Sequence, residues 1–144
     1  MTDASTIKGQ CLCGAVTVEA TPVSDGLTVC HCDMCRRHTS SMFIGISPDQ
    51  ATLKIEGPAK SFQSSDWAER GFCTKCGSTL WYGTTHDGAR YLAAGLFDNA
   101  GGAAPAVEYF SDKCPQGYHL DGVPKRLTEA ETIAFFTEGG APEG

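Results

Sequence analysis

Seven of the eight cysteines lie in three short groups, and this clustering limits what the chain can fold into more than any other feature. The groups read Cys11-Leu12-Cys13-Gly14, Cys30-His31-Cys32-Asp33-Met34-Cys35 and Cys73-Thr74-Lys75-Cys76-Gly77. Two cysteines so close in sequence can point their thiolates at one ion, each at about 2.3 Å from a zinc. A glycine directly after the second cysteine permits the positive φ that such turns need. The spacing therefore predicts metal binding.

The number of sulfurs in each group suggests how the ligands are shared. The two pairs followed by glycine, Cys11 with Cys13 and Cys73 with Cys76, together provide four sulfurs, which closes a structural tetrahedral site. The middle group then keeps three sulfurs and one open position, which is the arrangement of a catalytic zinc. In the alternative, the middle group joins one of the glycine-followed pairs, and two cysteines are left over.

Three other cysteine chemistries fit the sequence less well. Iron–sulfur clusters use four cysteines, and the spacings match neither common ferredoxin run. A thioredoxin-like redox pair at Cys32 and Cys35 would need a surrounding βαβ pattern, which is absent. A secreted, disulfide-bonded protein would need a secretory segment, and residues 1–6 have neither a basic cluster nor an apolar stretch. We therefore expect two zinc ions per chain in a cytoplasmic, thiol-reducing setting.

The composition favours a single, mainly β domain. A chain of 144 residues suits one domain with its own core. Its 17 glycines and 7 prolines predict a turn-rich fold of short strands, arranged as an antiparallel meander or as two small packed sheets. The expected strands cover residues 15–20, 27–29, 42–46, 52–55, 60–63, 79–82, 91–94 and 107–110.

A helix is expected only near the C-terminus. Thr128 and Glu131 have the spacing of a capping box, and Gly139-Gly140 would end the helix. An apolar side is expected from Ala130, Ile133, Ala134 and Phe136.

The charge and hydropathy of the chain argue against two classes of partner. The formal net charge is −6, and no basic run among the 11 lysines and arginines is longer than Arg36-Arg37. Nucleic-acid binders normally carry a basic stripe that displaces counterions from phosphates. No window approaches the roughly 18 apolar residues that a membrane span needs. We therefore expect neither nucleic acid nor membrane as a partner.

The cysteine groups lie within longer motifs. These read Gly9-x-Cys11-x-Cys13-Gly14-x-Val16, Cys30-His31-Cys32-x-x-Cys35-Arg36 and Phe72-Cys73-x-x-Cys76-Gly77-Ser78, and Asp121-Gly122-Val123-Pro124 follows near the end. Together they resemble the glutathione-dependent formaldehyde-activating enzyme (GFA) family. The resemblance extends from about Ile7 to Leu127 and implies a single GFA-like domain over residues 1–144.

The resemblance implies a fold, two metal sites and a reaction. The implied fold has Mss4-like twisted antiparallel sheets stapled by zinc, with a short C-terminal helix. The reaction of the family joins formaldehyde to glutathione, giving S-hydroxymethylglutathione, and is classed as a carbon–sulfur lyase reaction. The resemblance assigns the structural zinc to Cys11, Cys13, Cys73 and Cys76, and the second zinc, where the chemistry occurs, to Cys30, Cys32 and Cys35.

The proposed chemistry needs residues that hold the thiol. A zinc with three thiolates is a weak Lewis acid, but it can hold a fourth thiolate at neutral pH. Arg36 and Arg37 directly follow the middle group and are candidates to clamp the carboxylates of glutathione. The other interpretation is that both are solvated surface charges. His31 alternates with Cys30 and Cys32, so its side chain should point away from theirs.

A second class of function remains open from the sequence alone. A non-catalytic zinc module that binds a small thiol or a protein partner would use the same cysteines. The unpaired three-cysteine group favours an enzyme, because a purely structural module gains nothing from an open site. A fourth ligand within the chain would favour the module. The substrate could also be another small thiol in place of glutathione. Cys114, outside the three groups, is interpreted as a spare thiol.

Overall fold

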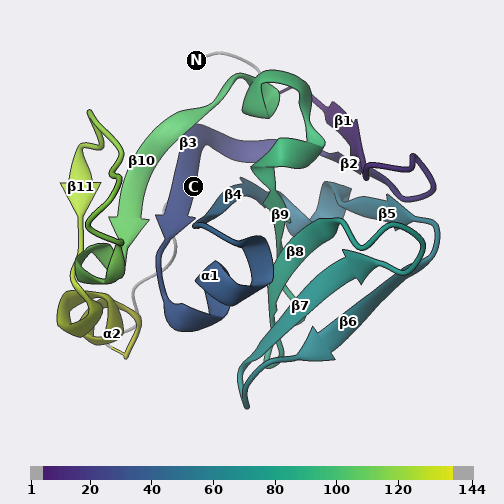
Figure 1. The fold of residues 1–144 in the computed structure, drawn as a ribbon. Coiled ribbons are helices and arrows are strands. Elements are labelled where there is room, and N and C mark those ends of the chain that lie inside the picture. The colour runs from purple at the N-terminus through teal and green to yellow at the C-terminus, as the bar shows by residue number, and fades with distance from the viewer. Residues whose placement is uncertain (1–4, 138–144) are drawn as a thin grey trace.

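The computed structural model describes residues 5–137, and the strands in this part of the chain form two sheets. A three-stranded antiparallel sheet has the order β1-β2-β5, and an eight-stranded sheet has the order β11-β10-β3-β4-β9-β8-β7-β6 (Figure 1). The strands are β1 (Ile7–Gln10), β2 (Thr17–Ala20), β3 (Pro22–Cys30), β4 (Phe43–Pro48), β5 (Lys54–Glu56), β6 (Ala59–Gln63), β7 (Ala68–Cys73), β8 (Thr79–Thr84), β9 (Arg90–Ala93), β10 (Ala104–Tyr109) and β11 (Lys125–Arg126). The helices are α1 (Asp33–Thr39) and α2 (Glu129–Thr137), with short 3-10 turns at Gln50–Thr52, Ala94–Leu96, Asp98–Gly102 and Ser111–Lys113.

The mainly β fold with a short C-terminal helix is confirmed, and every expected strand overlaps an observed one. The sheets are not wholly antiparallel, because β10 pairs in parallel with both β3 and β11. Strands β1, β7 and β11 and helix α1 were not expected. Strand β7 contains Glu69 and Arg70, which hide its alternation, and the seven residues of α1 are too few to show a helical period.

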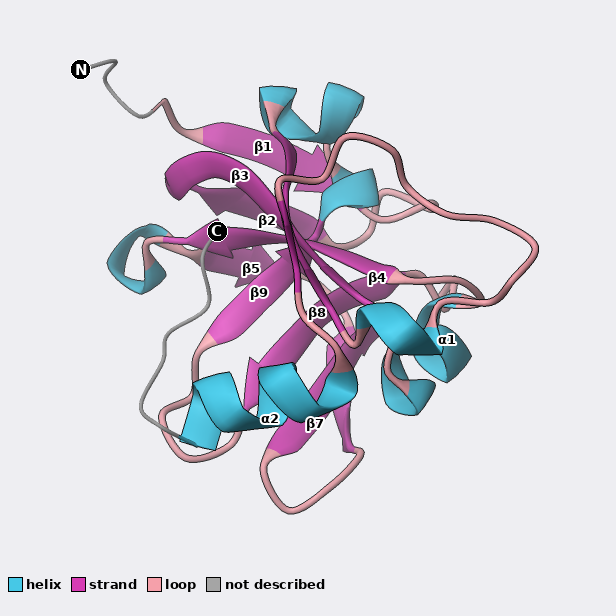
Figure 2. Ribbon diagram, turned by 90° about the vertical axis from the view of Figure 1, so that its left-hand side faces the viewer, coloured by secondary structure: helices cyan, strands magenta, loops and turns pink. Residues whose placement is uncertain are grey.

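The core lies under the strands that carry the cysteine groups. Val16, Val18, Leu80 and Leu92 are at most 2% exposed and pack in one hydrophobic cluster that also includes Cys11 and Cys73. Figure 2 shows the strands running through the middle of the molecule, with α1 and α2 at its periphery. Both cysteines of this cluster are therefore anchored by packed neighbours, which reduces their freedom to move apart.

Helix α2 begins as predicted but buries a different face. The amide of Thr128 donates to Glu131 Oε1 at 2.9 Å, and the amide of Glu131 donates to Thr128 Oγ1 at 3.2 Å, so the capping box is confirmed. Thr132 is the buried residue, and its Oγ1 accepts the Phe110 amide at 3.1 Å. The helix also packs against the buried Tyr109 of β10, whose ring centre lies 6.5 Å from that of Phe135 and 5.2 Å from that of Phe136. Of the expected apolar side, Ala130, Ile133 and Ala134 are exposed, whereas Phe136 is 40% exposed and contacts Tyr109.

Two remaining expectations concern the ends of the chain and the membrane. Gly139-Gly140, expected to end α2, lies outside the described residues. Within residues 5–137, neither helix has the length and apolar composition needed to cross a membrane.

Candidate metal centres

The two glycine-followed cysteine pairs meet at one place in the fold. The sulfurs of Cys11, Cys13, Cys73 and Cys76 all lie within 4.8 Å of one another, although about 60 residues separate the pairs along the chain. Cys13 Sγ lies 3.6 Å from Cys11 Sγ and 3.8 Å from Cys73 Sγ. Cys11 lies in the turn between β1 and β2, and Cys73 ends β7. We call this set the four-sulfur group.

The turns of the four-sulfur group have the backbone geometry that the sequence predicted. Gly14 and Gly77 both have φ of +78°, a conformation that side chains with a Cβ rarely adopt. The amides of Lys75 and Cys76 each donate to Cys73 Sγ at 3.4 Å. Donors aimed at a sulfur stabilise its thiolate, which is the form that binds metal.

Ser78 links the two halves of the four-sulfur group. Its hydroxyl accepts the Leu12 amide at 2.9 Å and lies 3.2 Å from Cys76 Sγ. The hydrogen bond from this hydroxyl, helped by the Ser78 amide, lowers the pKa of Cys76 to about 5. Ser78 therefore holds the first turn against the second and prepares one thiolate.

The middle cysteines form a separate group of three sulfurs. Cys30 ends β3, Cys32 is the N-cap of α1, and Cys35 lies in the first turn of that helix. Their sulfurs lie within 4.8 Å of one another, and the Cys35 amide donates to Cys32 Sγ at 3.4 Å. Within residues 5–137, no fourth metal-binding side chain joins this group. The seven sulfurs therefore divide into one group of four and one group of three, and the alternative in which the middle cysteines join a glycine-followed pair is not observed.

The three thiols of this three-sulfur group compete for protons. Hydrogen bonds from Cys30 and Cys35 lower the pKa of Cys32, whereas the same contacts and burial raise the pKa of Cys30. The group therefore favours one thiolate at Cys32 before the other two lose their protons. Metal ions bind thiolates, so a bound cation would draw off the remaining protons.

A buried arginine that the sequence did not suggest lies against the three-sulfur group. Arg70 on β7 is 4% exposed, and its Nη1 donates to Cys35 Sγ at 3.2 Å. Its Nε donates to Ser64 Oγ at 3.3 Å, and its guanidinium carbon lies 4.6 Å from the centre of the Tyr82 ring. Strand alternation, which puts Arg70 on the same face as the buried Ala68, is the signal that could have found it.

Burial shifts the pKa values of the groups around Arg70. Burial alone would lower the pKa of Arg70, but the charge and hydrogen bond of Cys35 outweigh it and raise that pKa. Burial raises the pKa of Tyr82 to about 12. Burial, and then the charge of Arg70, lower the pKa of His38, which favours the neutral imidazole. Arg70 is therefore a fixed positive charge beside the sulfurs.

The structure places Arg36 and Arg37 on α1, where both turn toward Asp33. Arg36 Nη2 donates to Asp33 Oδ1, and Arg37 Nη1 lies 4.0 Å from Asp33 Oδ2. The Arg37 side chain is 74% exposed. To clamp a ligand carboxylate, as the sequence suggested, either arginine would have to break its contact with Asp33 and bind that carboxylate instead.

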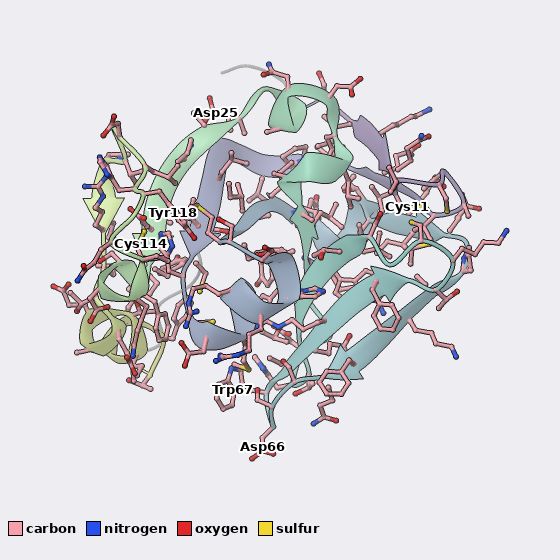
Figure 3. All side chains as sticks on the ribbon, viewed as in Figure 1. Cys11, Asp25, Asp66, Trp67, Cys114 and Tyr118 are labelled. Carbon is pink, nitrogen blue, oxygen red and sulfur yellow. The ribbon has the colours of Figure 1, made fainter. Side chains whose placement is uncertain are left out.

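His31 points away from the three-sulfur group and binds Glu108. His31 is fully buried, Glu108 is 3% exposed, and Arg126 Nε donates to Glu108 Oε1 at 2.9 Å. Cys114 lies beside this pair, and its thiol donates to the Tyr118 carbonyl at 3.2 Å. Figure 3 shows Cys114 and Cys11 on opposite sides of the molecule.

Metal binding by His31 and Glu108 together with Cys114 is less favourable than the structural role. The possible ligand atoms of His31, Glu108 and Cys114 lie within 4.8 Å of one another, as metal ligands would. The guanidinium of Arg126 occupies one Glu108 oxygen, however, and would repel a cation placed there. We interpret this set as a buried structural network.

The donor chemistry of the two cysteine groups fits zinc. Four sulfurs without oxygen donors suit a closed tetrahedral zinc site, and three sulfurs suit a zinc site with one position left for an outside ligand. The fold and these groups define a small, mainly β protein with two thiol-rich centres suited to metal.

Comparison with known proteins then identifies the family. The family described as glutathione-dependent formaldehyde-activating enzyme matches residues 6–113, and the chain belongs to this family. An uncharacterized lyase of Schizosaccharomyces pombe is 38% identical over 128 residues, which cover 88% of this chain and 93% of that protein. These matches support, at family level, a lyase-type function related to glutathione.

A solved structure supports the fold. The crystal structure of a Rhodobacter sphaeroides protein matches with a TM-score of 0.53 and 20% sequence identity. The match covers 69% of this chain and all of that chain. At this identity the likeness concerns the fold alone.

Proposed function

We propose that the protein is a zinc-dependent carbon–sulfur lyase that acts on a glutathione adduct. The favoured reaction joins formaldehyde to glutathione to give S-hydroxymethylglutathione, and a related reaction of a thiol with an aldehyde would use the same groups. One observation carries the proposal: the three sulfurs of Cys30, Cys32 and Cys35 gather without a fourth ligand from the described residues. The family match supports glutathione as the substrate class.

The two cysteine groups take different roles in this proposal. Cys11, Cys13, Cys73 and Cys76 would hold a structural zinc that fastens the turn after β1 to the end of β7. Cys30, Cys32 and Cys35 would hold the second zinc. When bound there, zinc would supply a position that stabilises an external thiolate at neutral pH.

The protein residues would position the reactants. Arg36 and Arg37 lie on the helix that carries Cys35, and each could exchange Asp33 for a glutathione carboxylate. The glutathione thiolate attacks the carbonyl carbon of formaldehyde, so a carbon–sulfur bond forms and the carbonyl π bond breaks. The former carbonyl oxygen takes up a proton from solvent. No protein nucleophile, oxidant or reductant is needed, and alignment of the reactants is the main contribution.

The reaction itself provides the test. Formation of S-hydroxymethylglutathione from formaldehyde and glutathione is followed by exchange NMR, with zinc-loaded protein and without protein. We expect the protein to accelerate the exchange above the spontaneous rate, and Cys32→Ser to lose this effect while Cys114→Ser keeps it. A zinc-loaded wild type that binds glutathione without any acceleration would overturn the enzyme and leave a thiol-binding zinc module.

A further inference from the structure

We infer that Arg70 makes the three-sulfur group selective for an anionic fourth ligand, so that the group accepts a thiolate in preference to a neutral donor. The inference rests on the proposed function, because it assumes a metal held by these sulfurs. It assigns a role to a residue that no cysteine motif includes. Arg70 acts through Cys35 and is therefore a positioning residue.

The contacts of Arg70 fix its guanidinium on one sulfur. Arg70 is 4% exposed, and its Nη1 donates to Cys35 Sγ at 3.2 Å. Cys35 is also buried, with 3% of its surface exposed. Ser64 holds Nε at 3.3 Å, and the Tyr82 ring lies 4.6 Å below the guanidinium carbon. With the group held on two edges and one face, the hydrogen bond to Cys35 has little freedom to break.

Among the described residues, the partners of the Arg70 guanidinium are the Cys35 sulfur, the Ser64 hydroxyl and the Tyr82 ring, and only the sulfur can carry a negative charge at neutral pH. Within the part of the chain that the structure describes, no carboxylate forms an ion pair with Arg70. A buried charge without a partner is strongly unfavourable, so a buried arginine indicates an anion beside it. The sulfurs of Cys35 and its neighbours are the groups at this site that would become anions on binding a metal.

The charge balance explains why a thiolate would be preferred. Three thiolates around a divalent cation carry one net negative charge, which the guanidinium of Arg70 neutralises. A fourth thiolate then enters a neutral environment, whereas without Arg70 it would meet a negative one. The hydrogen bond to Cys35 also withdraws electron density from that sulfur, so the metal can accept more from an incoming ligand. Both effects are stronger at a buried site than in water.

Arg70 and the two arginines of α1 would therefore act on different parts of glutathione. Arg36 and Arg37 would hold carboxylates, which S-methylglutathione also has. Arg70 is buried and already bonded to Cys35, so it cannot reach a ligand carboxylate without leaving that sulfur. Its contribution should be confined to ligands with a free thiol.

The experiment compares two ligands on three zinc-loaded proteins. Calorimetry measures the dissociation constants of glutathione and of S-methylglutathione for wild type, Arg70→Gln and Arg70→Lys, and zinc per chain checks that each is fully loaded. We expect Arg70→Gln to weaken glutathione binding about tenfold, the scale of one lost charge-assisted contact, with S-methylglutathione binding unchanged. Arg70→Lys retains the charge but loses the planar guanidinium that contacts Ser64 and Tyr82, so its glutathione affinity should lie between those of Arg70→Gln and wild type.

Two results would overturn the inference separately from the proposed function. If wild type prefers glutathione and Arg70→Gln keeps that preference at full zinc loading, Arg70 has no part in ligand choice. If both ligands weaken equally in Arg70→Gln, its role is only structural. A wild type that binds both ligands equally would overturn the proposed function and this inference with it. Should Arg70→Gln fail to fold, a loss of the glutathione preference in Arg70→Lys would contradict the charge argument.

Discussion

His31 and Glu108 form a buried pair that fastens the three-sulfur group to β10, 77 residues along the chain. His31 Nε2 contacts the Glu108 carboxylate, and the His31 amide donates to the Tyr109 carbonyl at 3.2 Å. Because His31 lies between Cys30 and Cys32, these bonds fix the backbone that carries both sulfurs. Groups that orient the ligands of a metal typically change its affinity 10- to 100-fold.

Loss of this pair should weaken the second zinc and spare the first. We expect Glu108→Ala to lower zinc affinity at the three-sulfur group about tenfold, whereas Glu108→Gln, which keeps an acceptor for His31, loses less. Competition with a chromophoric chelator resolves the two sites by affinity. Equal zinc affinities in Glu108→Ala and wild type would show that the pair does not position the cysteines.

Removal of the Ser78 hydroxyl should weaken zinc binding at the four-sulfur group. Ser78→Ala deletes the acceptor of the Leu12 amide and the partner of Cys76 Sγ, so the four-sulfur group should release zinc to a chelator several-fold faster. Ser61→Ala, at an exposed position on β6, is the matched control and should release zinc at the wild-type rate. Identical release rates in the two variants would contradict the bridging role.

The positive φ of Gly77 provides a test of backbone strain without a steric complication. A Cβ at Gly77 meets no atom within 4 Å, so Gly77→Ala adds the cost of a left-handed alanine, about 1 kcal/mol of unfolding free energy. Gly95 has equally free space but no positive φ, so Gly95→Ala should not lower the free energy of unfolding and should raise it by up to about 1 kcal/mol. Denaturant unfolding of the zinc-loaded proteins measures both. Equal stabilities would show that the turn does not need glycine.

Burial of the Tyr82 phenol predicts a loss of stability at alkaline pH. The pKa of Tyr82 rises from 10.0 to about 12 on folding, so the folded state resists ionisation of this group. Its contribution is complete below pH 10 and is lost as the pH rises toward 12. Absorbance titration should show one tyrosine ionising near pH 12 in the wild type, and Tyr82→Phe should remove that late step. A wild type without a late step would contradict the burial argument.

The turns that carry the cysteines could be predicted from the sequence because their geometry is local. Each turn is set by two nearby cysteines, and the alternation that turned His31 away from Cys30 and Cys32 involves adjacent residues only. Arg70 and Glu108 escaped prediction because their partners, Cys35 and His31, lie 35 and 77 residues away in the sequence and meet them only in the folded chain. The prediction that Ala130, Ile133 and Ala134 face the protein was wrong, because periodicity defines a face of a helix but not what lies against that face.

The zinc content of the purified protein, with and without glutathione, tests the central claim most directly. The account predicts about two zinc ions per wild-type chain and about one in Cys32→Ser, with the fold retained. Glutathione should protect the second zinc from chelation in wild type and in Cys114→Ser, but should have no effect in Cys32→Ser. A single zinc in all three proteins, without any response to glutathione, would contradict the account and leave a domain with one structural zinc.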